Sequence, residues 1–280
     1  MAIRITSDST CDLGKYAAER NVGIMPIKVV LDDKVYQDGI DITPADIFKF
    51  VEQTKLLPKT SAPSITDYQE FFTEQLQYGD EILHFNISSK SSVSHNVAKQ
   101  AAEEFKGKVH VIDSLALSSG QGLLVMKAAD LRDRGMGIDA IEEAINSLRA
   151  KVNTSFIPDR LDYLYKGGRC SKMEMYGANI LKIHPMIVMQ EGALGVHKKY
   201  RGKMSVCIKN YIEYLKELYP VYDKTRCFVT HSTADPELVE AAIAQVKDIF
   251  GFDEVLETVA GSVVTGHCGR NTLGVLFITE

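Results

Sequence analysis

Short strands, hydroxyl-rich turns and helices follow one another repeatedly in the first half of the chain. Apolar runs at residues 3–6, 81–87 and 108–112 each end in a turn rich in Ser, Asp or Thr, after which a helical pattern begins. This order predicts a mainly parallel α/β sheet with helices on both faces. Since ligands of open α/β sheets bind at the carboxyl ends of the strands, we expect the turns to border a binding site.

The pattern changes after the predicted helix at residues 138–151. A β-hairpin is predicted at 183–189 and 194–197, and further helices and strands alternate up to the end of the chain. We therefore expect an N-terminal α/β domain at residues 1–152 and a smaller α/β domain at residues 153–280.

Two segments have less regular patterns. Residues 23–31 read as one strand, in which Pro26 indicates either a sheet edge or the start of the strand. Residues 261–271 contain three glycines around His267, which would let the backbone approach a ligand closely or would simply make a turn.

The stretch from Leu57 to Ser64 gathers hydroxyl groups around two prolines. Because proline restricts its own backbone and that of the residue before it, we expect a stiff loop that holds Thr60, Ser61 and Ser64 in place. Residues 66–69 then have capping-box spacing, which predicts a helix N-terminus with free N–H donors suited to an anion. A plain turn followed by a helix cap is the alternative.

Charge and composition exclude several classes of function. The 32 basic and 37 acidic residues are interspersed and give a formal net charge of -5, so no footprint for nucleic acid is indicated. The absence of a signal-sequence pattern and of a long apolar run indicates a cytoplasmic protein without an anchor. No Cys-x-x-Cys pair is present, which is typical of free thiols in a reducing compartment. The cysteines are Cys11, Cys170, Cys207, Cys227 and Cys268.

Signatures of nucleotide and metal sites are missing from the sequence. It has no G-x-x-x-x-G-K-[ST] loop, and no G-x-G-x-x-G follows a strand. No two histidines are three or four residues apart, so no metal-binding helix is indicated. We therefore expect no cofactor and no metal.

Two interpretations are open for the hydroxyl groups and His267. No G-x-S-x-G elbow exists, yet Ser92, His267 and Asp8 could converge in space as a catalytic triad. Alternatively, Thr60, Ser61, Ser92 and His267 would act as neutral donors around one carboxylate. Such donors, with no Lys or Arg fixed beside them, suit a weakly held monoanion better than a phosphate.

Several motifs taken together are more specific than any one of them. The motifs are Ser7-Asp8-Ser9-Thr10 with Asp12-Leu13, Thr60-Ser61-Ala62-Pro63-Ser64, Ser88-Ser89-Lys90-Ser91-Ser92, Gly168-Arg169 and His267-Cys268-Gly269. In order and approximate spacing the whole chain resembles the DegV family. This family is similar in function to the FakB-type fatty-acid-binding subunits of bacterial fatty acid kinase. Those proteins hold an acyl chain in a tunnel between two α/β domains and show its carboxyl group to a separate ATP-dependent kinase subunit.

The resemblance implies roles for particular residues. Thr60, Ser61, Ser92 and His267 would bind the carboxylate, and Arg169 would help to dock or serve the kinase. Aliphatic side chains that could line the tunnel include those of Ile87, Leu115 and Ile180.

The chain departs from the family pattern at two positions. Val93 stands where many members have the Gly of Ser-Gly-Thr, and Arg270 stands where many have Pro. We expect Val93 to reshape the carboxylate loop or to narrow the pocket mouth. Arg270 would either add a charge contact or face solvent.

Energetics favour a lipid over a small acid. Each buried methylene contributes about 0.8 kcal/mol, so a chain of about fifteen offers about 12 kcal/mol before ordering and association costs. We therefore expect a carrier with no chemistry of its own, which binds a long-chain fatty acid and presents its carboxyl group to a kinase subunit. Contact with a membrane would be peripheral or transient. A serine-dependent acyl hydrolase or acyltransferase, and a purely protein-binding module, are the alternatives.

Overall fold

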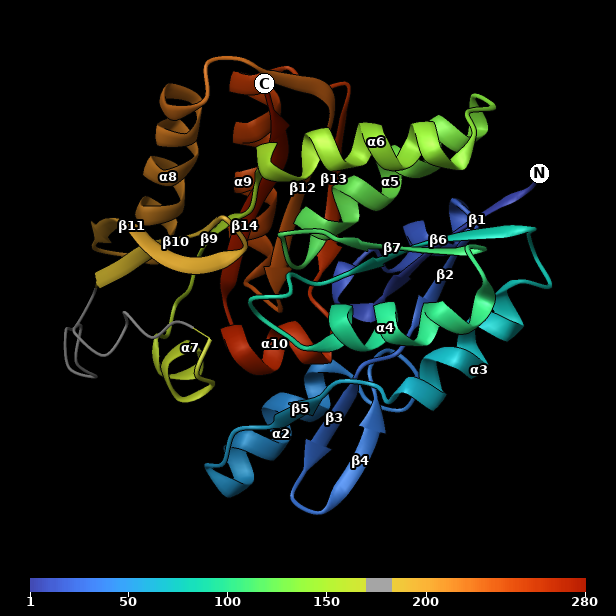
Figure 1. Ribbon diagram of the computed structural model, residues 1–280. Helices are drawn as coiled ribbons and strands as arrows, with labels where there is room; N and C mark the ends of the chain where they lie inside the picture. Colours follow the sequence, from blue (N-terminus) through green and yellow to red (C-terminus); the bar gives the residue numbers. More distant parts are fainter. Residues whose placement is uncertain (170–182) are drawn as a thin grey trace.

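The computed structural model describes residues 1–169 and 183–280 (Figure 1). Cys170 and Ile180, on which two of the sequence predictions depend, lie outside the described residues. No helix in the described part of the chain is long and apolar enough to cross a bilayer.

The N-terminal sheet has parallel strands in the order β2-β1-β6-β7. Its strands are β1 (Ile3–Asp8), β2 (Val22–Met25), β6 (Glu81–Asn86) and β7 (Val109–Asp113). Ser7 pairs with Phe85, and Asn86 pairs with Asp113, so the carboxyl ends of three strands meet at one edge. The predicted parallel sheet is therefore confirmed, and hydroxyl-rich turns follow its strands at this edge.

Helices cover both faces of this sheet, as the sequence predicts. One face carries α1 (Lys15–Glu19), α5 (Ser119–Asp133) and α6 (Ile138–Leu148), and the other carries α3 (Ile65–Gln75) and α4 (Ser94–Ala102) (Figure 1). Leu83 and Phe85 pack on the first face and Ile82 packs on the second, because successive side chains of a strand point to opposite sides.

The C-terminal sheet is mixed, and within the described residues its order is β11-β10-β9-β14-β12-β13, with β8 paired to β14. Its strands are β8 (Val152–Asn153), β9 (Ser155–Ile157), β10 (Ile183–Gln190), β11 (Ala193–Arg201), β12 (Tyr222–Ser232), β13 (Glu254–Val259) and β14 (Thr272–Thr279). Helices α8 (Met204–Leu218) and α9 (Pro236–Phe250) pack against it in one hydrophobic cluster. The predicted hairpin is confirmed as β10 and β11. A division into two domains at residue 152 stays a prediction.

Helix α5 lies between the two sheets and packs against both. The buried side chains of Leu124 and Val125 belong to one hydrophobic cluster with Phe85 of β6, Phe228 of β12 and Leu276 of β14. A helix that is buried on nearly all sides is expected where two layers share it.

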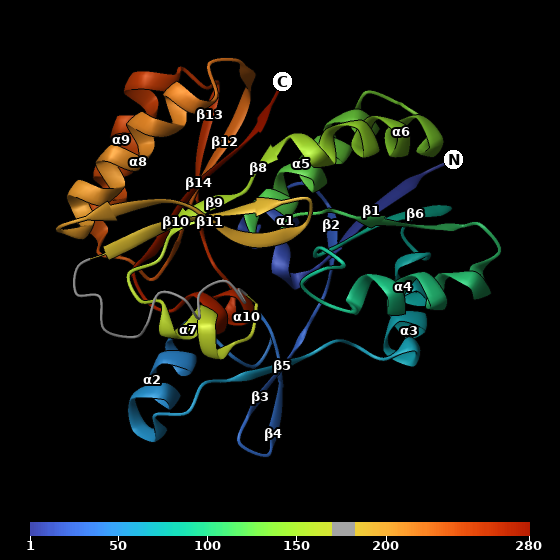
Figure 2. The ribbon, with the colours of Figure 1, turned by 60° about the vertical axis from the view of Figure 1, so that its left-hand side comes forward.

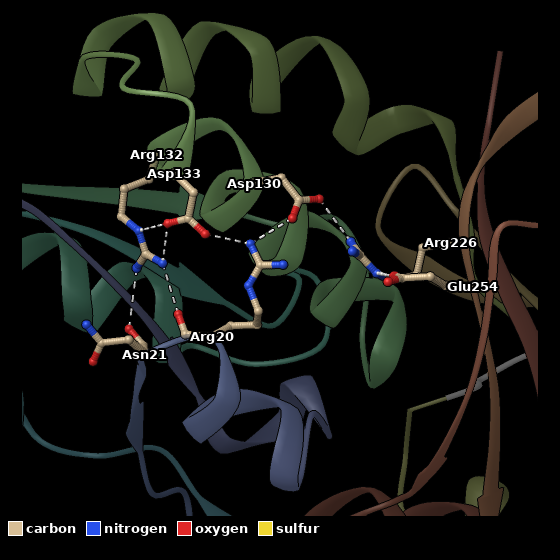
Figure 3. Close-up of polar contacts among 7 residues, drawn as sticks. All are labelled: Arg20, Asn21, Asp130, Arg132, Asp133, Arg226 and Glu254. Atoms are coloured by element: carbon tan, nitrogen blue, oxygen red, sulfur yellow. Dashed lines mark hydrogen bonds and ion pairs between the residues drawn. The ribbon is translucent and has the colours of Figure 1, made fainter.

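Ion pairs connect the C-terminal end of α5 to neighbouring elements (Figure 3). Arg226 on β12 is 8% exposed and contacts Asp130 on α5 at 3.1 Å and Glu254 on β13 at 2.6 Å. Arg20, next to α1, contacts the other oxygen of Asp130 at 2.7 Å and reaches Asp133 at 2.9 Å. Two guanidinium groups therefore share one carboxylate, and we call this network the α5 junction.

A third, antiparallel sheet, which the sequence did not predict as separate, lies beside α2 (Pro44–Thr54) in both ribbon views (Figures 1 and 2). It consists of β3 (Lys28–Leu31), β4 (Lys34–Gln37) and β5 (Lys59–Ser61). The expectation of one strand over residues 23–31 is wrong, because the chain changes sheets at Pro26, which has no N–H to donate. The expected loop around Thr60 is also a short strand, in which Thr60 pairs with Val29.

Two helix predictions need correction. Helix α3 starts earlier than expected, with Ser64 rather than Thr66 as its N-cap. Ser64 Oγ accepts the N–H of Asp67 at 3.1 Å, and the carboxylate of Asp67 accepts the N–H of Ser64 at 2.7 Å. The glycine-containing segment 261–271 is not a simple turn, because it contains helix α10 (Ser262–Cys268). Helix α7 (Asp162–Lys166) lies beside α10 in both ribbon views (Figures 1 and 2).

Candidate functional site

A cavity of about 360 Å³ lies where the three sheets approach one another. It is lined by residues from eight separate segments of the chain, and all of the site residues predicted from the sequence border it. These residues are Thr60, Ser61, Ser92, Arg169 and His267. The volume falls within the usual range of small-molecule pockets, about 300 to 1,000 Å³.

His267 is in the last turn of α10 and points its ring toward the small sheet. Its Nε2 lies 3.1 Å from Thr60 Oγ1 on β5, although the two residues are 207 positions apart in the sequence. Its Nδ1 is buried and has no hydrogen-bond partner among the described residues. Burial, and to a smaller degree the charge of Arg169, lowers the pKa of His267 to about 4, so the imidazole is neutral at pH 7.

Glycines let α10 fit tightly between its neighbours. A Cβ on Gly266 would lie 2.7 Å from the Pro58 ring, and one on Gly269 would lie 2.9 Å from the Tyr163 ring. A Cβ on Gly167 would lie 2.7 Å from Nδ1 of His267. The glycines near His267 therefore serve close packing against protein, whereas the sequence suggested an approach to a ligand or a turn.

Two buried carboxylates hold the beginning of α10. Asp12 Oδ1 accepts the N–H of Gly261 at 2.8 Å, and Asp38 Oδ1 accepts the N–H of Ser262 at 2.7 Å. Burial raises the pKa of both carboxyl groups. Since Asp12 and Asp38 come from the first 40 residues and α10 is the last helix, the two ends of the sequence meet at this point.

The serine-rich segment after β6 is fixed from beneath by Asp8. The carboxylate of Asp8 accepts the N–H of Ile87 at 2.8 Å and the side-chain amide of Asn86 at 3.1 Å. Ser92 Oγ lies 2.8 Å from Ser94 Oγ and accepts the Ser94 N–H at 3.2 Å, at the start of α4. This arrangement places the hydroxyl of Ser92 at the cavity wall.

The geometry does not supply a catalytic triad. Proton transfer from a serine needs a base within hydrogen-bonding distance. Among the described residues, however, the hydroxyl of Ser92 hydrogen-bonds to Ser94, and the one hydrogen bond of the His267 ring is with Thr60. The carboxylate of Asp8 is occupied by donors from its own sheet edge.

Two cationic side chains also border the cavity. Arg169 is exposed and donates to the carbonyl of Gly167 at 2.7 Å, and Lys90 lies within the serine-rich segment. Lys90 belongs to the serine-rich motif, in which only hydroxyl groups were expected to bind the carboxylate. Because Arg169 is held by a backbone carbonyl rather than by the hydroxyl groups, a site without a lysine or arginine fixed beside them stays a prediction.

The two departures from the family pattern have different outcomes. Val93 borders the cavity and is 62% exposed, which fits a position at the mouth. Arg270 neither borders the cavity nor faces solvent alone, because its guanidinium lies 4.3 Å from the centre of the Phe48 ring and 3.5 Å from Glu52 Oε1. Arg270 therefore fastens the end of α10 to α2.

Ser61 and Ser64 differ in position. Ser61 is exposed and borders the cavity, whereas Ser64 caps α3 and is not part of the lining. Leu115, a candidate for the tunnel wall, packs near Gly192 and is not part of the lining either, whereas Ile87 is.

Larger aliphatic side chains form much of the remaining wall, together with further hydroxyl groups and Cys268. The aliphatic residues include Ile27, Ile87, Leu117, Leu164, Leu194, Val263 and Val264. Apart from Ile87, the sequence analysis did not single them out, because isolated aliphatic residues of different elements have no local pattern that separates a cavity wall from a core. No cluster of metal-ligating side chains is present in the described part of the chain.

A family model with the description "Uncharacterised protein, DegV family" matches residues 2–280. The chain belongs to the DegV family. Among solved DegV proteins, one from Thermus thermophilus described by its fatty acid binding is 28% identical, with a TM-score of 0.90 and full coverage of both chains. A stearic acid-binding protein from Eubacterium ventriosum is 27% identical, with a TM-score of 0.84 over 99% of this chain and 98% of that one.

The same fold occurs in a component of a kinase system. The B3 protein of Streptococcus pneumoniae fatty acid kinase, solved with linoleic acid, is 22% identical to this DegV chain, with a TM-score of 0.86 over the full length of both. At this identity the likeness shows the shared fold alone.

Proposed function

We propose that this protein binds a long-chain fatty acid, with the carboxylate at Thr60, Ser61 and Ser92, His267 orienting Thr60, and the chain along the aliphatic wall. The observation that carries this proposal is the convergence of neutral donors from distant segments on one cavity that is otherwise mainly aliphatic. The fatty acids bound by DegV proteins from Thermus thermophilus and Eubacterium ventriosum support the same ligand class.

The contact between His267 and Thr60 sets the direction of hydrogen bonding. If Nδ1 carried the ring proton, a buried N–H would have no acceptor, which folded proteins rarely tolerate. We therefore assign the proton to Nε2, which donates to Thr60 Oγ1. The hydroxyl proton of Thr60 is then free to donate to the carboxylate, so that His267 orients Thr60.

Affinity comes mainly from the hydrocarbon chain. A few neutral hydrogen bonds contribute about 1 kcal/mol each, whereas a buried chain of about fifteen methylenes contributes about 12 kcal/mol before association costs. The hydroxyl groups thus orient the head group without holding it so tightly that it could not react elsewhere.

We further propose that the protein presents the carboxyl group to a separate ATP-dependent kinase subunit and performs no chemistry itself. Arg169, exposed at the cavity and near His267, is in a position to contact such a partner. The fold shared with the B3 protein of fatty acid kinase is consistent with this role.

Native mass spectrometry of protein purified from bacteria tests the binding step. We expect a bound fatty acid, and we expect the double substitution Ser92→Ala with His267→Ala to weaken its retention and its phosphorylation in the presence of a fatty acid kinase and ATP. Purified protein that neither carries nor takes up fatty acid would contradict the proposal. Turnover of a p-nitrophenyl acyl ester, or covalent labelling of Ser92, would favour the hydrolase instead.

A further inference from the structure

A second, much smaller cavity lies behind the first. It has a volume of about 30 Å³ and is lined by residues of β9, β12, β14, α10 and the loop before α5. Leu117, Val264 and Cys268 border both cavities, so these three side chains form a partition between them. We call the small space the distal cavity.

We propose that the acyl chain passes Leu117, Val264 and Cys268 and ends in the distal cavity, so that this partition and the space behind it set the chain length that the protein accepts. This inference rests on the proposed function. It adds a specificity determinant that neither the head-group residues nor the sequence motifs contain.

One side of the partition is firmly held. Leu117 lies in a loop whose neighbours Leu115 and Ser118 both have positive φ angles, at 52° and 53°. Such backbone persists only where surrounding bonds enforce it. Here Ser88 donates its N–H to Ala116 O at 2.9 Å, and the Ser118 hydroxyl donates to Asp12. Leu117 is therefore a fixed wall rather than a mobile side chain of a flexible loop.

The other side belongs to α10. Val264 and Cys268 are one helical turn apart, which puts both on the same face, and His267 precedes Cys268 directly. The helix that carries the proposed head-group residue thus also carries half of the partition. Since α10 is held at its start by Asp12 and Asp38, the distance from head group to partition is set by a rigid element.

The far wall of the distal cavity is formed by closely packed strands. Phe156 and Leu276 are 5% and 3% exposed, and a Cβ on Gly274 of β14 would lie 2.7 Å from the Ser155 carbonyl and 3.0 Å from Phe156 Cβ. Three paired strands leave little freedom for movement. A space of about 30 Å³ exceeds the minimum for one water molecule by about twofold, so it can hold only the last group of a chain.

Chain-length profiles test the inference. Dissociation constants are measured for saturated fatty acids from decanoate to eicosanoate, first for the unaltered protein. We expect affinity to rise by up to about fourfold per methylene, the equivalent of about 0.8 kcal/mol, until the distal cavity is filled, and then to fall.

Two opposite changes should move this optimum in opposite directions. The double substitution Leu117→Ala with Val264→Ala enlarges the passage and should shift the optimum toward longer acids. Ala260→Val fills the distal cavity, which Ala260 borders. It should weaken the binding of the longest acids at least tenfold and change the dissociation constant of decanoate by no more than about twofold. A milder change, Cys268→Ala, should shift the optimum as the double substitution does, but less.

Matched controls separate cavity shape from lost core packing. Leu215→Ala with Val246→Ala, and Cys207→Ala, remove the same atoms from buried positions around α8 and α9 that border neither cavity. They should lower thermal stability without moving the optimum.

The two proposals fail differently. If the unaltered protein binds no fatty acid, the proposed function fails. If it binds fatty acids but the altered proteins keep the same optimal chain length, or if their affinities for all chain lengths change equally, the role of the partition is refuted.

Discussion

The α5 junction and the head-group end of the cavity both unite distant segments, but they do so with opposite chemistry. At the junction, Arg20, Arg226 and Asp130 pair their charges within 3.1 Å. In the cavity, Thr60 and a neutral His267 make the equivalent connection between the small sheet and α10. Paired charges satisfy one another and leave little capacity for a ligand, whereas neutral hydroxyl groups keep a donor free. The charged α5 junction therefore stabilises the fold, whereas the neutral groups of the cavity can bind a ligand.

The largest expected effect concerns pH and tests the neutrality of His267. Its pKa is about 4 in the folded protein and about 6.5 when unfolded, so the folded state binds fewer protons between these values. The stabilising effect of a neutral His267 is complete above pH about 6.5 and is lost as the pH falls toward 4, by about 3 kcal/mol. Urea unfolding of the unaltered protein and of His267→Gln over this range measures the difference.

Other buried groups also contribute to the pH dependence of stability, but they are common to both proteins. The raised pKa values of Asp12 and Asp38 act in the opposite direction, and the lowered pKa of His84 acts in the same direction. They cancel when the two unfolding curves are subtracted. Identical pH dependence of the two proteins would show that folding does not lower the pKa of His267.

The next largest effect is expected from a substitution that breaks the α5 junction. Arg226→Met leaves Glu254 and one side of Asp130 without their partner, although Asp130 keeps Arg20. We expect a loss of about 2 kcal/mol in the free energy of unfolding, less than for a fully isolated buried charge. Fatty-acid affinity should not change, because the junction lies outside the cavity.

An exposed ion pair provides the comparison for this substitution. Arg160 pairs with Asp162 at 2.8 Å, and the Arg160 side chain is 64% exposed. Arg160→Met should cost less than about 1 kcal/mol. Equal losses for both arginines would mean that burial does not strengthen the junction.

A smaller effect is expected from a substitution that displaces the His267 ring but leaves the His267 side chain itself unchanged. Gly167→Ala places a methyl group 2.7 Å from Nδ1 of His267 and 2.8 Å from the Tyr163 carbonyl oxygen, so the ring must move from its position beside Thr60. We expect about tenfold weaker fatty-acid binding, equivalent to about 1.4 kcal/mol, measured by fluorescent-ligand displacement. Gly137→Ala, at a position where an added Cβ meets nothing within 4 Å, should leave binding unchanged.

The smallest expected effect comes from removing one hydroxyl group. Thr60→Val keeps the shape of the side chain but can neither donate to a carboxylate nor accept from Nε2 of His267, so binding should weaken about fivefold, or about 1 kcal/mol. Calorimetric titration with one fatty acid measures it, with the exposed Thr73→Val in α3 as control. An unchanged affinity would remove Thr60 from the head-group site.

The sequence was sufficient to predict the parallel sheet and the residues that meet in the cavity. Thr60, Ser92 and His267 each stand in a short motif, and motifs at the ends of elements can be recognised locally. Helix α10 was not predicted, since Val263, Val264 and Thr265 are β-branched and Gly266 disfavours a helix. Packing against Pro58 and Tyr163, which no local pattern contains, stabilises it instead.

The distal cavity could not be predicted from the sequence either. Its walls come from β9, β12, β14 and α10, and the strand pairings that bring them together are a property of the whole fold. The change of sheet at Pro26 was missed for a related reason. A proline at this position is compatible with an edge strand or a strand start, and only the partners of the flanking residues distinguish them from a crossing between sheets.

The hydrogen bonds that attach the start of α10 to Asp12 and Asp38 have a consequence for biosynthesis. The carboxylates leave the ribosome 249 and 224 residues before the N–H groups of α10 that they accept. A nascent chain that has not yet released α10 therefore has no completed pocket, and the proposed lipid loading has to wait for this helix.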